Sequence, residues 1–180
     1  MTRTERLVAH FRRERSWTRS LVAAVPEERF DWAPAPDEFS CGGVVVHLIH
    51  AEVFWRRLLV AAAAGDAYDP FRLAGEMTER YAAFRPRNFE SSRTARFGST
   101  FAEILAVWTP IEEETASALA AIPEERLLSA TVRHPVAGLS TSLEDMFLTF
   151  FSHESHHRGQ LSAYLKMLRC PQPPLFTEGP

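Results

Sequence analysis

The sequence predicts an all-α protein, a four-helix bundle with one long crossover connection. Two observations support this prediction: apolar residues recur at helical spacing in four long segments, and prolines or glycines separate these segments. The composition agrees with it, because 46% of the 180 residues are hydrophobic and 24% are charged, which is typical of globular chains. We expect a single domain that spans residues 1–180.

The first two predicted helices flank a linker that is rich in proline and glycine. The first helix covers about residues 4–25 and stops at Pro26. The linker covers residues 26–43, where prolines and glycines disfavour helical structure. The second helix covers about residues 44–64 and ends at Gly65, because glycine is a common helix C-cap.

The sequence of the second half of the chain predicts the crossover and two more long helices. Residues 66–98 are the least regular part and form the crossover, with a short helix at 73–84. The third long helix covers about residues 100–122, and the segment 127–136 is predicted to be extended. The fourth covers about 141–169. Both long helices begin with the Thr-x-x-Glu pattern of a capping box.

The charge balance and the cysteines exclude several classes of protein. With 23 acidic and 20 basic residues the net charge is −3, so we expect no nucleic-acid partner. No apolar run approaches the roughly 20 residues that cross a bilayer, and the N-terminus does not resemble a signal peptide. We therefore expect a cytoplasmic protein without membrane contact. Cys41 and Cys170 are predicted to be free thiols, and a position beside a helix N-terminus would lower the pKa of Cys41.

Two histidines of the fourth predicted helix share its apolar stripe. At about 100° per residue, His153 and His157 lie about 40° apart on the helical wheel, within the stripe that contains Met146 and Leu161. His156 falls on the polar side. The helix therefore directs two imidazoles toward the core and a third toward its edge.

Imidazoles at positions i and i+4 are well placed to bind one metal ion, because their Cβ atoms are about 5–6 Å apart. His47 lies on the apolar face of the second helix and is predicted to be the third ligand, with His50 as the alternative. Without a shared partner, each buried imidazole would cost about 1–3 kcal/mol of desolvation. Three protein ligands and one free position are typical of a catalytic metal site.

A second motif overlaps this one. The run from His153 to His157 matches H-E-x-x-H, the signature of zinc peptidases in which the glutamate is the general base. The metzincin continuation is missing, because Gln160 stands where glycine is required. Glu154 lies at the margin of the apolar stripe and Tyr164 near its centre, so both are candidate catalytic residues.

The same region resembles a known family. The run His153-Glu-Ser-His-His157-Arg-Gly-Gln160 matches the H-x-x-x-H-R-G-Q signature of the DinB/YfiT-like superfamily, and His47 followed five residues later by Glu52 resembles its second helix. The resemblance implies a four-helix bundle in which His47, His153 and His157 bind a divalent metal, with zinc or nickel expected. Where members often carry tryptophan, this chain has Phe39, which we interpret as a packing position outside the site.

The resemblance also implies a range of functions. The superfamily includes thiol S-transferases that use bacterial low-molecular-weight thiols, and stress-associated proteins. We expect a metal-dependent enzyme that transfers such a thiol to a small electrophile. The alternatives are a hydrolase that uses metal-bound water and a non-catalytic metal-binding module of the stress response. A small-molecule substrate is expected, and an apolar helix face predicts a homodimer.

Overall fold

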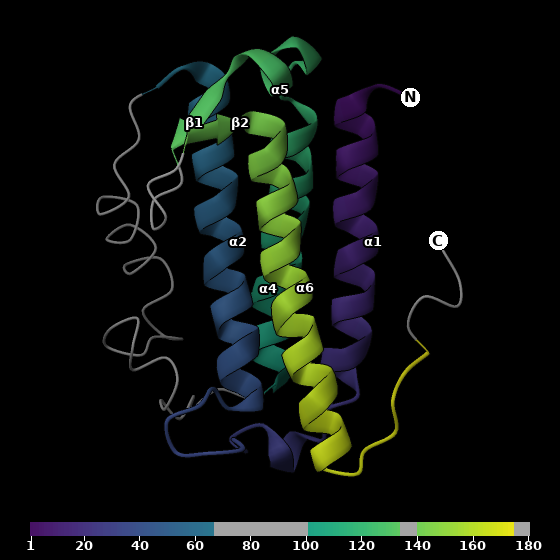
Figure 1. Cartoon of the computed structure of the whole chain (residues 1–180). Coiled ribbons are helices and arrows are strands. Elements are labelled where there is room, and N and C mark those ends of the chain that lie inside the picture. Colours follow the sequence, from purple (N-terminus) through teal and green to yellow (C-terminus); the bar gives the residue numbers. More distant parts are fainter. Residues whose placement is uncertain (67–100, 134–139, 175–180) are drawn as a thin grey trace.

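Four long helices run side by side in the computed structural model of the chain, which confirms the predicted bundle (Figure 1). Their bounds are α1 Arg3–Ala23, α2 Cys41–Ala64, α4 Phe101–Ala120 and α6 Leu143–Met167. The structure describes residues 1–66, 101–133 and 140–174. The predicted crossover, its short helix at 73–84 and the end of the predicted extended segment lie outside the described residues.

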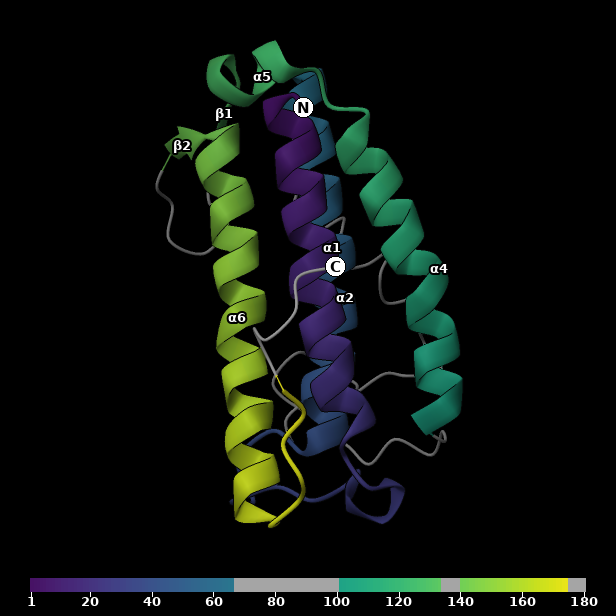
Figure 2. The same ribbon diagram turned by 90° about the vertical axis from the view of Figure 1, so that its right-hand side faces the viewer.

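Short elements gather at the two ends of the bundle (Figure 2). The 3₁₀ helix η1, Glu27–Arg29, follows α1, whereas α5, Glu124–Ser129, follows α4. Strand β1, Thr131–Arg133, then pairs antiparallel with β2, Ser140–Ser142. The prediction of an extended segment from residue 127 was therefore partly wrong. A Pro-Glu-Glu start favours a helical turn at both η1 and α5, because acidic residues stabilise the first turn of a helix.

Serine residues decide where two of the long helices begin. The Ser40 hydroxyl accepts a hydrogen bond from the backbone N–H of Gly43 at 2.9 Å, so α2 begins three residues before the predicted start. Both glycines predicted to lie in the linker are thus helical. At the start of α6 the capping residue is Ser142, which accepts from the Asp145 N–H at 3.1 Å. The predicted cap, Thr141, was wrong by one residue.

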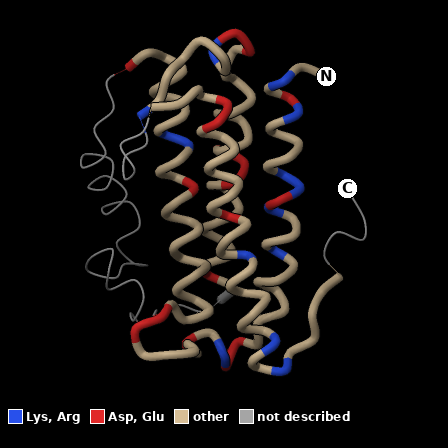
Figure 3. The backbone as a smooth tube through the Cα atoms, viewed as in Figure 1, with Lys and Arg blue, Asp and Glu red and all other residues tan. Residues whose placement is uncertain are grey.

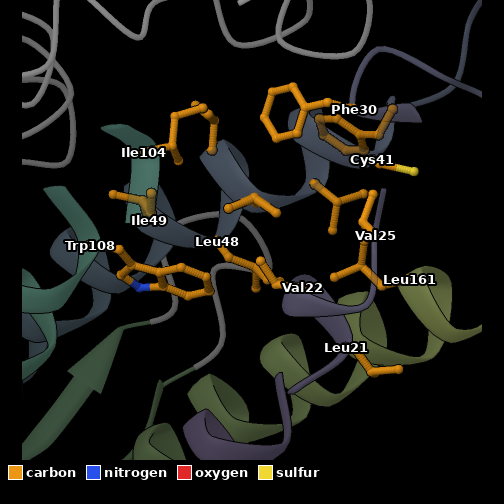
Figure 4. Packing of buried hydrophobic residues seen from close by; sticks show 14 of the residues in the cluster. Leu21, Val22, Val25, Phe30, Cys41, Leu48, Ile49, Ile104, Trp108 and Leu161 are labelled. Atoms are coloured by element: carbon orange, nitrogen blue, oxygen red, sulfur yellow. The ribbon is translucent and has the colours of Figure 1, made fainter. Parts of the chain in front are cut away.

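The core consists of two clusters of buried side chains, one toward each end of the bundle. Figure 4 shows the cluster on the η1 side, where all four long helices contribute, through residues such as Val22, Leu48, Trp108 and Leu161. The cluster on the α5 side is richer in aromatic rings, among them Phe11, Trp55, Phe147 and Phe150. The faces of α2 and α6 that carry the predicted metal ligands both point into the interior of the bundle.

Ion pairs join α4 to its neighbours. Three consecutive glutamates of α4 each pair with an arginine of another helix, in the pairs Arg19–Glu112 at 3.1 Å, Arg12–Glu113 at 3.1 Å and Arg56–Glu114 at 3.0 Å. Figure 3 shows acidic and basic residues following one another along α1. Among the helices that the structure describes, none has both the length and the apolar character to cross a membrane.

Candidate metal centre

Three histidine rings from two helices meet in the interior of the bundle. Each of His47, His153 and His157 offers one nitrogen, and these three atoms lie within 4.8 Å of one another. The Nε2 atoms of His47 and His153 are 3.0 Å apart. The ring centroids are separated by 4.5 Å between His47 and His157 and by 4.7 Å between His153 and His157. The structure thus brings together the three ligands predicted from the sequence.

The burial of the histidines agrees with the helix faces that were predicted from the apolar stripes. His47 and His157 are buried and His153 is half-buried, whereas His156 is exposed on the outer side of α6. His156 contacts the ring of His157, with centroids 4.9 Å apart, but it is outside the cluster. His50, the alternative ligand on α2, is half-buried and is also outside the cluster.

The surroundings favour neutral imidazoles. Burial, together with the neighbouring His157 and His156, lowers the pKa of His153 to about 4. Burial also lowers the pKa of His157, although a hydrogen bond from its ring to Gln160 opposes this change. A neutral ring presents the lone pair that a metal ion requires.

The donor set fits a divalent metal ion. Two imidazole nitrogens on one zinc ion each lie about 2.0–2.1 Å from it, and the 3.0 Å between the Nε2 atoms of His47 and His153 is within that reach. The other ring nitrogen of His153, Nδ1, is buried and has no hydrogen-bond partner in the described part of the chain. Imidazole ligands suit zinc, copper, iron and nickel.

Aromatic side chains enclose the cluster. The Phe39 ring lies 5.1 Å from the His47 ring and 6.0 Å from the His157 ring, centroid to centroid. The Trp55 ring is 6.4 Å from that of His153. The interpretation of Phe39 as a packing position outside the site was wrong, since it contacts two of the three histidines. The rings of Phe39 and Trp55 lower the polarity around the cluster.

The two carboxylates nearest the ligands in sequence are bound to α1 instead. One nitrogen of Arg15, Nη2, lies 2.7 Å from Glu52 Oε2 and 3.3 Å from Glu154 Oε2. Thr18 Oγ1 donates to Glu154 Oε1 at 2.7 Å, and Trp108 Nε1 donates to Glu52 Oε2 at 2.7 Å. Burial raises the pKa of Glu154, although Arg15 opposes this effect. A catalytic role for Glu154 stays a prediction, and its carboxylate is directed to α1.

Tyr164, the other catalytic candidate, lies about two turns beyond His157 on α6. Its hydroxyl accepts a hydrogen bond from Gln160 Nε2 at 2.8 Å, and its ring packs edge-on against Trp32, with centroids 5.5 Å apart. Burial raises the pKa of the Tyr164 hydroxyl. A catalytic role for Tyr164 also stays a prediction.

Cys41 behaves differently from the prediction. It is the first residue of α2, but burial raises the pKa of its thiol to about 11. The expected lowering by the helix N-terminus was wrong, because the thiol is shielded from water. Both cysteines are free thiols, as predicted.

Two residues of this region had no predicted role. Arg15 lies on the apolar stripe of α1 between Phe11 and Thr18, and a charged residue in such a stripe indicates a buried partner of opposite charge. Gln160 lies three residues after His157, so it was within reach of the ring on one helix face. Both signals were present in the sequence, but neither identifies the partner without the fold.

Comparisons with known proteins agree with this architecture. A sequence model of the DinB superfamily matches residues 10–161. A DinB-like protein from Bacillus subtilis, YjoA, has a similar structure, with a TM-score of 0.65 and 17% identity over 95% of this chain and 96% of that chain. A conserved protein from Enterococcus faecalis has a TM-score of 0.60 and 19% identity over 93% and 97%. No curated protein matches this chain significantly in sequence.

Proposed function

Because this chain belongs to the DinB superfamily, we propose that it is a divalent-metal-dependent enzyme that transfers a low-molecular-weight thiol to a small electrophile. His47, His153 and His157 would hold the ion, and zinc and nickel are among the metals that imidazole ligands accept. The observation that carries this proposal is the meeting of three imidazoles from α2 and α6 within 4.8 Å.

Three protein ligands leave a coordination position for a substrate. When bound, a divalent ion supplies Lewis acidity that lowers the pKa of a thiol at that position, so that a thiolate is available at neutral pH. The aromatic rings of Phe39 and Trp55 beside the histidines keep the surroundings apolar. Low polarity strengthens the interaction of a thiolate with any positive charge.

Thiol transfer is favoured over peptidase-like hydrolysis by the position of Glu154. A hydrolase with the H-E-x-x-H motif needs the glutamate as general base beside its metal. Glu154 is instead buried between Thr18, which donates a hydrogen bond to its Oε1, and Arg15, whose guanidinium lies 3.3 Å from its Oε2. A thiol has an ordinary pKa of about 8.5 and loses its proton far more readily than water does, so it does not require that base.

The experiment measures the loss of free thiol in the presence of an electrophile. Purified protein loaded with zinc or nickel is mixed with 1-chloro-2,4-dinitrobenzene and with glutathione or cysteine as probe thiols. We expect metal-dependent consumption of thiol above the rate without protein. Replacing His153 by alanine should abolish both metal binding and turnover. His156→Ala is the matched control on the same helix and should leave both nearly unchanged.

Three outcomes would overturn this proposal. Tight metal binding without consumption of any probe thiol would favour a non-catalytic metal-binding module. Turnover of ester or amide substrates without thiol would favour a hydrolase. Equal loss of binding in His153→Ala and His156→Ala would contradict the assignment of the ligands.

A further inference from the structure

A chain of hydrogen bonds runs along α6 from the histidine cluster to a buried tyrosine. His157 Nδ1 is 3.0 Å from Gln160 Oε1, and Gln160 Nε2 is 2.8 Å from the Tyr164 hydroxyl. The three residues are spaced by three and four positions, so they lie on one face of the helix. His157 and Tyr164 are 7% and 4% exposed, so water competes little for these bonds.

The chemistry of the amide decides which atoms carry hydrogen. The amide oxygen of Gln160 only accepts hydrogen bonds, so the His157 ring must carry its proton on Nδ1. The other ring nitrogen, Nε2, then keeps its lone pair. The amide nitrogen of Gln160 only donates, and the Tyr164 oxygen accepts from it.

The opposite orientation of the amide would have the opposite effect. An amide N–H against Nδ1 of His157 would place the ring proton on Nε2, where it would block an ion. Binding at Nε2 and the observed orientation of Gln160 therefore support each other.

We propose that Gln160 is a positioning residue for the candidate metal centre, because its side-chain oxygen keeps the His157 proton on Nδ1 and leaves Nε2 free for the ion. Tyr164 assists by accepting from the amide nitrogen. This inference rests on the proposed metal binding. Partners of this kind orient a ligating ring, and their loss typically weakens metal affinity by about 10–100-fold.

The first experiment needs no metal. Long-range ¹H–¹⁵N spectra of the metal-free protein report which nitrogen of each histidine carries the proton. We expect His157 to be protonated on Nδ1 in the wild type and to shift toward Nε2 in Gln160→Leu. Because this measurement is independent of the ion, it separates a failure of the inference from a failure of the proposed function.

The second experiment measures zinc affinity by competition with a chelating dye. Gln160→Leu should bind zinc about 10–100-fold more weakly. Gln160→Glu should bind at least as well as the wild type, since a carboxylate also accepts from Nδ1–H. Gln172→Leu is the matched control, because Gln172 is exposed in the C-terminal tail and bonds only to Ser162 in the described chain. Urea unfolding confirms that each variant is folded.

Two results would overturn the inference. Wild-type zinc affinity in folded Gln160→Leu would show that the ligand does not depend on this bond. An unchanged Nδ1–H form of His157 in that variant would show that other contacts set the ring proton. If the wild type binds neither zinc nor nickel, the proposed function fails, and the spectra alone then decide the role of Gln160.

Discussion

Arg15 places a positive charge between α1, α2 and α6, where its side chain is 1% exposed. It contacts Glu52 and Glu154, which are 0% and 1% exposed, and its guanidinium lies over the Trp108 ring at 4.4 Å. Its Nε and Nη1 atoms and one oxygen of Glu52 have no hydrogen-bond partner in the part of the chain that is described. This cluster joins all four long helices through buried charge.

Removing Arg15 should destabilise the protein strongly. Arg15→Leu leaves two buried carboxylates without their cation, and breaking such a pair typically costs about 3–5 kcal/mol of unfolding free energy. Arg12→Leu is the control on the same helix, because Arg12 and Glu113 are exposed. It should cost about 1 kcal/mol or less. Urea unfolding measures both, and a similar small loss in the two variants would contradict a structural role for the buried charge.

At the scale of the helix, two glycines have opposite surroundings. Gly42 lies in the first turn of α2, and a Cβ built on it would collide with the Phe30 ring. Gly159 lies within α6, and a Cβ there would meet nothing within 4 Å. The close approach of Phe30 to the backbone of α2 therefore depends on glycine at position 42.

Alanine at the two positions should change stability in opposite directions. Gly42→Ala should lower the free energy of unfolding by about 1–3 kcal/mol, because the Phe30 ring must move. Gly159→Ala should raise it by about 0.5–1 kcal/mol, because alanine has the higher helix propensity. Thermal or urea unfolding tests both. A stabilised Gly42→Ala variant would show that Phe30 moves aside at no cost.

The four long helices were predictable because their apolar stripes repeat over many turns. The ends of these helices were less predictable. Ser142 has a neighbour with a similar side chain, Thr141, and the two glycines after Ser40 favour a linker where α2 in fact begins. The helix α5 was missed because its six residues are too few for a clear period.

The clustering of the three histidines was predictable, but their surroundings were not. Helical spacing identifies which histidines share a face, so His153 and His157 could be separated from His156. The contacts of Phe39 with two rings depend on how the loop before α2 folds back, which no periodicity describes. The ion pair between Arg15 and Glu154 could not be predicted without knowing how α1 packs against α6.

The stability of the whole molecule should depend on pH through His153. In the unfolded chain the pKa of His153 is about 6.5, and burial together with His157 and His156 lowers it to about 4 in the fold. Between these values the unfolded state binds the proton and the folded state does not. The free energy of unfolding should therefore fall as the pH drops from about 6.5 to about 4.

Urea unfolding of the protein in EDTA at several pH values tests this expectation. His153→Gln should show a smaller loss of stability over that pH window than the wild type. His156→Gln is the control and should keep the wild-type dependence. An equally steep fall in both variants would mean that other groups cause the acid sensitivity.

His47 and His153 are separated by 106 residues in the chain. Individual helices form within about a microsecond, but these two rings meet only after distant halves of the chain have closed on each other, against the entropy of a long loop. The visible absorption of cobalt(II) changes when imidazole coordinates it, so cobalt binding would report when the histidines meet during refolding. The absorption change would appear with the last long-range contacts and not with the first helical turns.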